Sequence, residues 1–225
     1  LRRALGDDPT QDFQRAAATL ETAVELNPAY AIAWANLGMV NRTRALVALE
    51  SGDNPDRLLT EARSALDGAL EMNPSLSFAT LERLAVANLD LRRRAPNASP
   101  ELIRSTQRRA RATVEAFPAS ASILQTAAET MLWSARSSQG ATLREHLDQG
   151  LIMAERAVRL DESSWRARLT RARLEAERAG TATDAAATSA RQRALADLDA
   201  AVALNPMAQR EAAALRAEIE SPGAG

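Results

Sequence analysis

The chain contains one histidine and no cysteine, which limits the chemistry that its side chains can perform. His146 lies in a charged segment beside Glu145 and Asp148. One histidine cannot make a multi-histidine metal site, and no cysteine or serine elbow accompanies it. No glycine-rich phosphate loop occurs either. We therefore predict no catalytic, metal-binding or cofactor-binding residue, and we expect an exposed histidine on a helix whose acidic residues pair with Arg144, Arg156 and Arg159.

The most concentrated charge is basic. Residues 90–111 contain seven arginines and two acidic residues, a local charge of +5. Arg104, Arg108 and Arg111 are spaced i, i+4, i+7, so on a helix they share one face. Such a face could bind an acidic peptide, a phosphorylated segment or phosphate. The alternative is a solvated surface, on which arginine is favoured near a helix C-terminus. The net charge of −1 for the whole chain argues against a dedicated nucleic-acid binder.

These residues lie in a sequence that repeats. A helix-ending phrase occurs five times, as AVELNP, ALEMNP, TVEAFP, AVRLDE and AVALNP, and its last residues are 46, 44, 44 and 44 positions apart. A fixed period of this kind indicates stacked supersecondary units rather than one globular fold. Apolar residues make up 46% of the chain but aromatic residues only 3%, which suits helices packed through small side chains. We predict an all-α solenoid of antiparallel helix pairs.

Each period is predicted to hold a long A helix, a polar break and a B helix that ends in the recurring phrase. In the first complete unit, Trp34, Leu37 and Val40 follow a spacing close to 3.6 residues. The break from Gly52 to Pro55 supplies a glycine, a capping asparagine and a proline suited to a first turn. The predicted helices are 12–26, 30–51, 56–72, 77–94, 101–117, 120–138, 143–160, 164–179, 190–204 and 207–220, with a looser segment at 180–188.

These residues resemble the tetratricopeptide-repeat family. Its pattern of Trp followed by Leu-Gly is matched by Trp34, Leu37 and Gly38. The small positions of its second helix are matched by Ala62, Leu66, Ala69 and Pro74; by Ala16, Leu20 and Ala23; by Gly150, Ala154 and Ala157; and by Ala194, Leu198 and Ala201, whereas one unit has Thr106, Ala110 and Thr113. The resemblance implies a right-handed superhelix with closely approaching helices. The units are longer than the family's repeat of about 34 residues, and this long form resembles repeats C-terminal to bacterial serine/threonine protein kinases.

The resemblance also implies a binding surface, because A helices form most of the inner face of the family's superhelix. The family's groove positions transfer to Asn36, Met39, Arg42 and Thr43; to Glu82 and Arg83; and to Gln125, Glu129 and Trp133, with Ala35, Val86, Leu89, Asp90, Thr126 and Leu132 beside them. The fourth unit does not align with this pattern. Trp34 falls on a packing position of the family. Trp133 and Trp165 do not, so each of these two could anchor a partner.

We interpret residues 1–220 as one solenoid domain with units near 29–74, 75–118, 119–162 and 163–206, half-repeats at both ends and a disordered tail at 221–225. The expected function is a non-catalytic module that binds a protein or peptide segment on the concave A-helix face, in a larger bacterial signalling protein such as a kinase. The alternative is a scaffold that self-associates or spaces domains. No nucleic-acid partner is expected, and no membrane insertion, because no apolar run approaches the ~20 residues of a membrane span. The start at Leu1 suggests a piece of a longer protein. Without cysteine, the sequence does not reveal the compartment.

Overall fold

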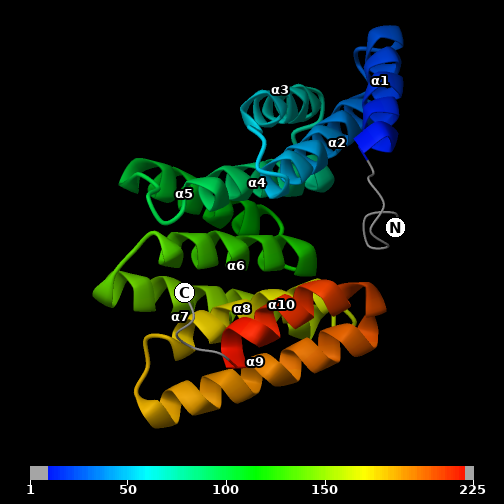
Figure 1. Cartoon of the computed structure of the whole chain (residues 1–225). Helices are drawn as coiled ribbons and strands as arrows, with labels where there is room; N and C mark the ends of the chain where they lie inside the picture. Colours follow the sequence, from blue (N-terminus) through cyan, green and yellow to red (C-terminus); the bar gives the residue numbers. More distant parts are fainter. Residues whose placement is uncertain (1–9, 221–225) are drawn as a thin grey trace. The chain divides into compact units, whose positions relative to one another are not determined.

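The computed structural model describes residues 10–220, and all regular structure in that range is helical (Figure 1). The ten α-helices of the described range are α1 Thr10–Leu26, α2 Ala31–Glu50, α3 Asp56–Met72, α4 Ser77–Arg94, α5 Pro100–Ala116, α6 Ala121–Arg136, α7 Gly140–Leu160, α8 Trp165–Ala179, α9 Asp184–Leu204 and α10 Gln209–Glu220, with a short 3-10 helix, η2, at Pro206–Ala208. The prediction of an all-α fold built from helix pairs is confirmed. The predicted tail at 221–225 lies outside the described residues.

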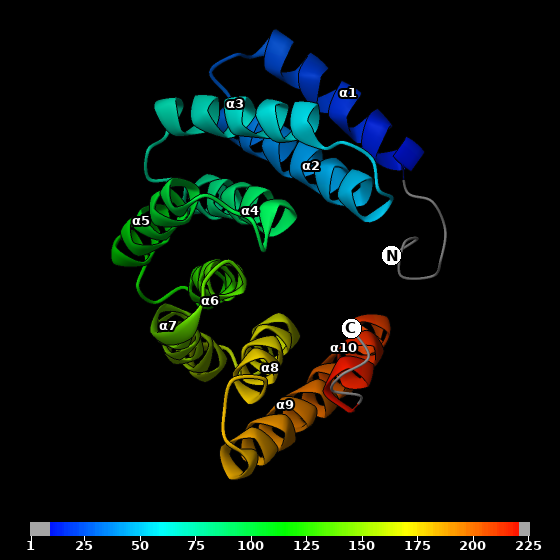
Figure 2. The ribbon, with the colours of Figure 1, turned by 60° about the vertical axis from the view of Figure 1, so that its left-hand side comes forward.

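The helices form two compact units, the first ending at Arg93 and the second beginning at Arg94. In the first unit α1 packs on α2 and α2 on α3, and Val86 and Leu89 of α4 join the core of α2 and α3. In the second unit each helix from α5 to α10 packs on the next, and α8 also contacts α6 and α10 (Figure 2). Helix pairs therefore stack in sequence order within each unit. One continuous domain over 1–220 stays a prediction.

The turns between helices use the residues that the sequence indicated. Gly52 has a φ of 82°, a left-handed conformation that favours glycine after the end of a helix. Asn54 Oδ1 accepts a hydrogen bond of 2.9 Å from the first amide of α3. Serine side chains accept amide hydrogen bonds at the N-termini of α5, α6 and α8, where they satisfy otherwise unpaired donors: Ser99, Ser120 and Ser164.

Two B helices begin three or more residues earlier than the sequence predicts. The α7 helix starts at Gly140 instead of residue 143, and this glycine also has a positive φ, 58°. The α9 helix starts at Asp184, so the looser segment is confined to 180–183. The additional turn of α9 is stabilised by tertiary packing, because Ala187 and Ala190 are buried in one cluster with Ala179. Residues 184–189 are rich in alanine and include no large apolar residue, so the sequence shows no helical periodicity there.

Small residues make the closest contacts between helices. An added Cβ at Gly38 would overlap the side chain of Leu66. At Gly150 it would lie 2.8 Å from Leu174 Cδ2 and 3.1 Å from Met131 Cβ. The small positions of α3, α7 and α9 are all buried, namely Ala62, Leu66, Ala69, Gly150, Ala154, Ala157, Ala194, Leu198 and Ala201, whereas Ala16, Leu20 and Ala23 of α1 are half-buried. The close packing implied by the family pattern is thus present in both units.

The sequence repeat that departs from this pattern, residues 75–118, buries two threonines on α5. Thr106 Oγ1 donates to the Leu102 carbonyl and Thr113 Oγ1 to the Arg109 carbonyl, each at 2.9 Å. Because both hydroxyl donors are satisfied within their own helix, burying them leaves no unpaired donor. Threonine can therefore replace alanine at these contacts.

Candidate interaction surface

His146, the one histidine of the chain, is half-buried instead of exposed. Its Nε2 lies 2.8 Å from Gln107 Nε2 on α5, and its Nδ1 lies 3.3 Å from Ser138 Oγ, just after α6. Burial lowers the pKa of His146 below its ordinary value, and the nearby charge of Arg111 acts in the same direction. The expectation of an exposed surface histidine is corrected: the imidazole joins α5 and α7.

Two hollows in the described surface differ in size. One of about 180 Å³, lined in part by Phe13, Arg44 and Leu58, is below the ~300 Å³ at which ligand pockets usually begin. A second, of about 320 Å³, is lined by residues of α9 and α10 that include the ion pair of Asp199 and Arg216. Within residues 10–220, no three histidine or acidic side chains are grouped so that they could hold a metal ion. No described helix combines the length and apolarity needed to cross a membrane.

In the first unit, the charged residues predicted for the groove are engaged in ion pairs between helices. Arg42 Nε on α2 lies 2.7 Å from Glu82 Oε2 on α4, and both side chains are largely buried. Arg83 Nε lies 2.6 Å from Asp67 Oδ1 on α3, a B helix. The structure therefore brings Arg42 and Glu82 together but directs Arg83 towards a different helix.

The uncharged candidates on α2 are half-buried. Thr43 Oγ1 donates to the Met39 carbonyl at 2.9 Å, and Met39 packs against the core between α1 and α2. Asn36 lies one turn before them on the same helix. The positions named beside the candidates are buried and form no surface in either unit: Ala35, Val86, Leu89, Asp90, Thr126 and Leu132.

On α6 the structure places the predicted residues along one stripe. Glu129, Trp133 and Arg136, spaced i, i+4, i+7, are partly exposed, while every residue between them is buried. Gln125, one turn earlier, is 8% exposed and donates to Glu129 Oε1 at 2.7 Å and to Thr170 Oγ1 of α8 at 3.1 Å. The guanidinium carbon of Arg136 lies 4.8 Å from the centre of the Trp133 ring, within cation–π range.

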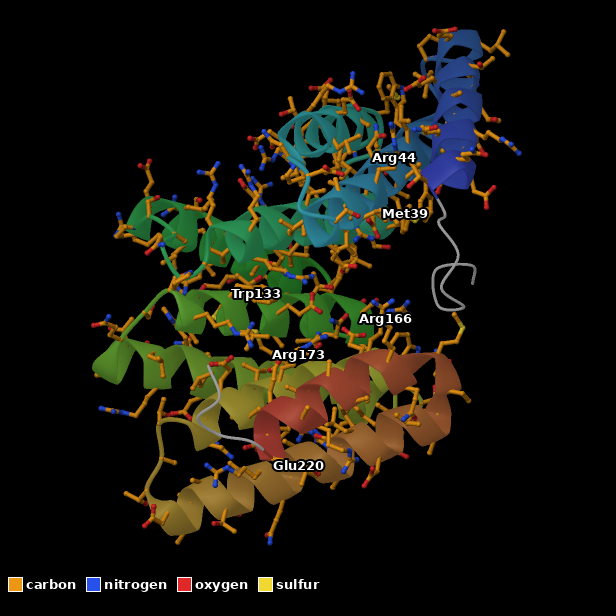
Figure 3. All side chains as sticks on the ribbon, in the orientation of Figure 1. Met39, Arg44, Trp133, Arg166, Arg173 and Glu220 are labelled. Atoms are coloured by element: carbon orange, nitrogen blue, oxygen red, sulfur yellow. The ribbon has the colours of Figure 1, made fainter. Side chains whose placement is uncertain are left out.

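The α8 helix continues this stripe. Arg173 and Glu177 come 44 positions after Glu129 and Trp133, one repeat later. The Arg136 guanidinium lies 2.5 Å from Glu177 Oε1. The family pattern did not align this unit, but the 44-residue period alone would have found both residues. Arg166 and Arg173 are spaced i, i+7 and so share one side of α8. We call six residues the α6–α8 face, of which Trp133, Arg166 and Arg173 are labelled in Figure 3: Glu129, Trp133, Arg136, Arg166, Arg173 and Glu177.

Another side of α8 is fixed to α9 by buried charges. Arg171 donates two hydrogen bonds of 2.6 Å to Asp197, whose side chain is only 6% exposed. These hydrogen bonds raise the pKa of Arg171 above its ordinary value. Glu175, also buried, accepts hydrogen bonds from Arg178 and Arg193. Arg171 and Arg193 therefore hold α8 against α9, whereas Arg178 pairs within α8.

Trp133 itself packs in part against the core of α6, α7 and α8, and the other two tryptophans also pack against cores. Trp34 Nε1 donates to the Pro28 carbonyl at 2.9 Å, and its ring packs against the cores formed by α1, α2 and α3. This matches the packing position of the family pattern. Trp165 begins α8 and packs against the core of α8, α9 and α10, with the Arg166 guanidinium 4.3 Å from its ring centre.

Arg104, Arg108 and Arg111 are exposed on α5. The basic cluster of the sequence does not act as one group, because Arg93 pairs with Asp56 at 2.5 Å and with Asp90 at 2.8 Å in the first unit. We call the three residues on α5 the arginine stripe. They belong to a B helix, whereas the α6–α8 face lies on A helices.

The recurring phrase also places exposed apolar residues at the ends of B helices. These residues occupy the same position of the phrase in four of its five copies: Leu26, Met72, Leu160 and Leu204. Leu26 is 82% exposed. The sequence reasoning did not single out this position, although the repeated phrase contains it.

No protein-family model matches this chain. No curated protein sequence matches it either. Among solved structures, its fold is similar to the crystal structure of YrrB, described as a TPR protein with an unusual peptide-binding site. That similarity covers 90% of this chain and 82% of the other, with 17% sequence identity and a TM-score of 0.47. The stacked helix pairs and their small-residue contacts identify the chain itself as a helical-repeat protein.

Proposed function

We propose that this chain is a non-catalytic protein-interaction module that binds a protein or peptide segment on the α6–α8 face. The observation that carries the proposal is the partly exposed Trp133, which lies between Glu129 and Arg136 on the partly exposed stripe of α6. Tryptophan and arginine are enriched among the residues that contribute most to binding between proteins. Because α6 buries nearly all its other side chains, the stripe stands on a rigid support, which reduces the entropy lost on binding.

The chemistry of this face indicates the kind of segment that it fits. Trp133 offers an apolar ring, Glu129 offers acceptors and Arg166 offers donors, while Glu177 and Arg173 are already paired with Arg136 and Glu211. The face carries three arginines and two glutamates, so both signs of charge are present, and electrostatic complementarity would select the order of charges in the partner more than its net charge. We propose a segment with one apolar side chain on Trp133 and charged side chains on either side of it.

The first unit has a smaller part in the proposal. Asn36, Met39 and Thr43 remain proposed contact residues on α2. Arg42 and Glu82 are proposed to act by bracing α2 against α4, since their charged groups already lie 2.7 Å apart. A partner that used either charge would first have to break this pair, which costs part of its binding free energy.

We further propose that the module recruits or regulates within a larger bacterial signalling protein such as a serine/threonine kinase. The support for this context is the resemblance of the long repeat to regions that follow such kinases. Reading the coding sequence upstream of residue 1 tests it. A kinase domain there would support the context, and another kind of domain would remove it without affecting the binding surface.

Self-association is the second candidate, and the exposed Leu160 and Leu204 favour it. End-to-end stacking is less favoured, because the described terminal helices α1 and α10, apart from Leu26, turn mainly polar and small side chains outward. Leu160→Glu with Leu204→Glu should convert an associated form to monomers in light scattering if this candidate is right. A wild-type chain that is monomeric across the concentration range would exclude it.

The binding proposal is tested with peptides selected from a random display library on the wild-type chain. Their affinities are then measured by calorimetry for wild type, Trp133→Ala and the control Ile152→Ala. Ile152 is exposed on α7, so its replacement also removes apolar surface. Trp133→Ala should weaken binding at least tenfold, roughly the ~1.4 kcal/mol expected at minimum for an anchor residue, while the control stays within about twofold. Unchanged affinity in Trp133→Ala would refute the proposed surface.

A further inference from the structure

The arginine stripe lies on the side of α5 away from its buried residues, with Arg111 near enough to His146 of α7 to act on its charge. Ile103, Thr106, Ala110 and Thr113 form the buried face of α5. At about 100° per residue, Arg104, Arg108 and Arg111 lie roughly 150° around the helix from that face. All three side chains are exposed. The stripe is therefore a second surface of the second unit, separate from the α6–α8 face.

These arginines also differ from most others in the second unit by their lack of a carboxylate partner. Arg136, Arg171, Arg173 and Arg193 each form an ion pair with an acidic residue of another helix. In the part of the chain that the structure describes, no ion pair involves the arginines of the stripe. Three guanidinium groups on one helix face thus keep their donors directed to solvent, which is the arrangement that a charged partner can use.

The spacing of the stripe indicates the form of the partner. Along the helix axis Arg108 lies about 6 Å beyond Arg104, and Arg111 about 4.5 Å beyond Arg108. A single phosphate group is bound best by donors that converge on one point, whereas this stripe distributes three charges along two turns. Planar guanidinium groups pair with carboxylates in a bidentate manner. The stripe therefore fits several carboxylates spaced along a chain.

Two acidic residues limit the length of that partner. Glu101 precedes the stripe and Glu115 follows Arg111 by one turn, both exposed on α5. A long polyanion such as a nucleic acid would meet like charge at both ends, and like charges oppose binding. A short acidic run on the partner would reach neither Glu101 nor Glu115. Basic residues on either side of the run would add favourable pairs with the two glutamates.

We infer that the outer face of α5 binds a short acidic protein segment, with Arg104, Arg108 and Arg111 pairing with three carboxylates at i, i+4 and i+7 of a helix. The α5 backbone that carries these residues is fixed at its start by Ser99, whose hydroxyl accepts the Leu102 amide at 3.2 Å. This surface acts beside the proposed α6–α8 face and does not depend on it. A protein that used both would be held at two sites.

The probe is a helix-forming peptide with glutamates at i, i+4 and i+7, compared with the same peptide carrying glutamines. Binding is measured by fluorescence anisotropy at low ionic strength. Wild type should bind the glutamate peptide about tenfold more tightly than the glutamine peptide, since each exposed pair contributes modestly and three act together. Raising the salt concentration should reduce the difference. Equal affinity for the two peptides would overturn the proposal.

A matched pair of triple variants assigns the site. The first changes Arg104, Arg108 and Arg111 to glutamine, and the second makes the same changes at Arg144, Arg191 and Arg210 of α7, α9 and α10. The control arginines also form no ion pair in the described range, so both variants lose the same charge. The first should lose about tenfold in affinity for the glutamate peptide and the second less than about twofold. Equal losses would mean that only net charge matters and would overturn the assignment.

Two further measurements separate this surface from other possibilities. Trp133→Ala should bind the glutamate peptide as wild type does, so a failed α6–α8 face would leave this result unaffected. A single-stranded oligonucleotide should bind more weakly than the peptide. If it bound at least as tightly and lost affinity in the α5 variant, the stripe would be a nucleic-acid site and the peptide proposal would be wrong. Circular dichroism melts should be alike for both triple variants, because all six side chains lie outside the described cores.

Discussion

Arg136 of α6 and Glu177 of α8 form an ion pair of 2.5 Å between successive A helices, and the same guanidinium lies 4.8 Å from the centre of the Trp133 ring. One arginine therefore links two helices and holds the aromatic ring that we propose as an anchor. This geometry positions Trp133 before any partner arrives, which lowers the ordering cost of binding.

The first prediction concerns the strength of this pair. Both side chains are about one third exposed, at 34% and 32%, so water screens their attraction. A double-mutant cycle with Arg136→Ala and Glu177→Ala should give a coupling free energy below ~1 kcal/mol in denaturant unfolding. A coupling of several kcal/mol would show that the pair is far less solvated than its exposure indicates.

A buried pair should behave differently. Asp197→Ala removes both hydrogen-bond acceptors of Arg171 and leaves that guanidinium unpaired, with 25% of its side chain exposed. We expect a loss of about 3 kcal/mol in the free energy of unfolding. The control Glu211→Ala breaks the more exposed pair with Arg173 and should cost less than ~1 kcal/mol. Similar losses for the two variants would contradict the assignment of Asp197 as a structural charge.

Two glycines of the first unit should respond to alanine in opposite directions. At Gly38 a Cβ would overlap Leu66 and lie 3.2 Å from the Ala62 carbonyl oxygen, so Gly38→Ala should destabilise by ~1–3 kcal/mol. At Gly68 a Cβ would make an ordinary contact of 3.5 Å with the Trp34 ring. Gly68→Ala should therefore stabilise by ~0.5–1 kcal/mol through helix propensity. Chemical denaturation of both variants checks the signs, and a stabilising Gly38→Ala would refute the tight contact.

The pH dependence of stability should contain a contribution from His146. Its pKa is lower in the folded protein, chiefly because of burial, so at falling pH the unfolded chain takes up the proton first. This contribution is fully present above about pH 6.5, the ordinary pKa of histidine, and is lost as the pH falls through the folded value. Gln107 and Ser138 contact the ring, and Arg111 and Glu145 act on its charge.

His146→Gln isolates this contribution, because the chain has no other histidine. Melting temperatures of wild type and variant are compared from neutral to mildly acidic pH. The wild-type value should fall relative to the variant as the pH decreases, whatever constant offset the substitution causes. Parallel curves would contradict the burial of this imidazole.

Most of the fold could be predicted from the sequence, because its signals are local and repeated. Gly52 and Asn54 mark a turn by their own conformational preferences, and the predicted bounds of α3 and α4 match the structure. The start of α9 at Asp184 could not be predicted, since Ala187 and Ala190 are helical there through packing with Ala179. Packing between elements leaves little trace in an alanine-rich segment.

The candidate site was predictable only in part, for a similar reason. The groove positions of the family pattern led to Glu129 and Trp133, because helical spacing fixes which residues share a face. The pairing of Arg42 with Glu82 joins residues 40 positions apart. It depends on the distance and angle between two helices, which spacing within either helix does not reveal. In the structure Arg42 and Glu82, which the sequence predicted as partner contacts, instead pair with each other and join α2 to α4.

The measurement that tests the central claim most directly is site-specific crosslinking of a library-selected peptide. The photo-reactive residue benzoylphenylalanine is placed at Glu129 or Arg173 on the α6–α8 face, or at Ile152 on α7 as the control. The account predicts peptide crosslinks from both positions on the face, suppressed by excess unlabelled peptide, and none from Ile152. Crosslinks from Ile152 with none from the other two positions would contradict it.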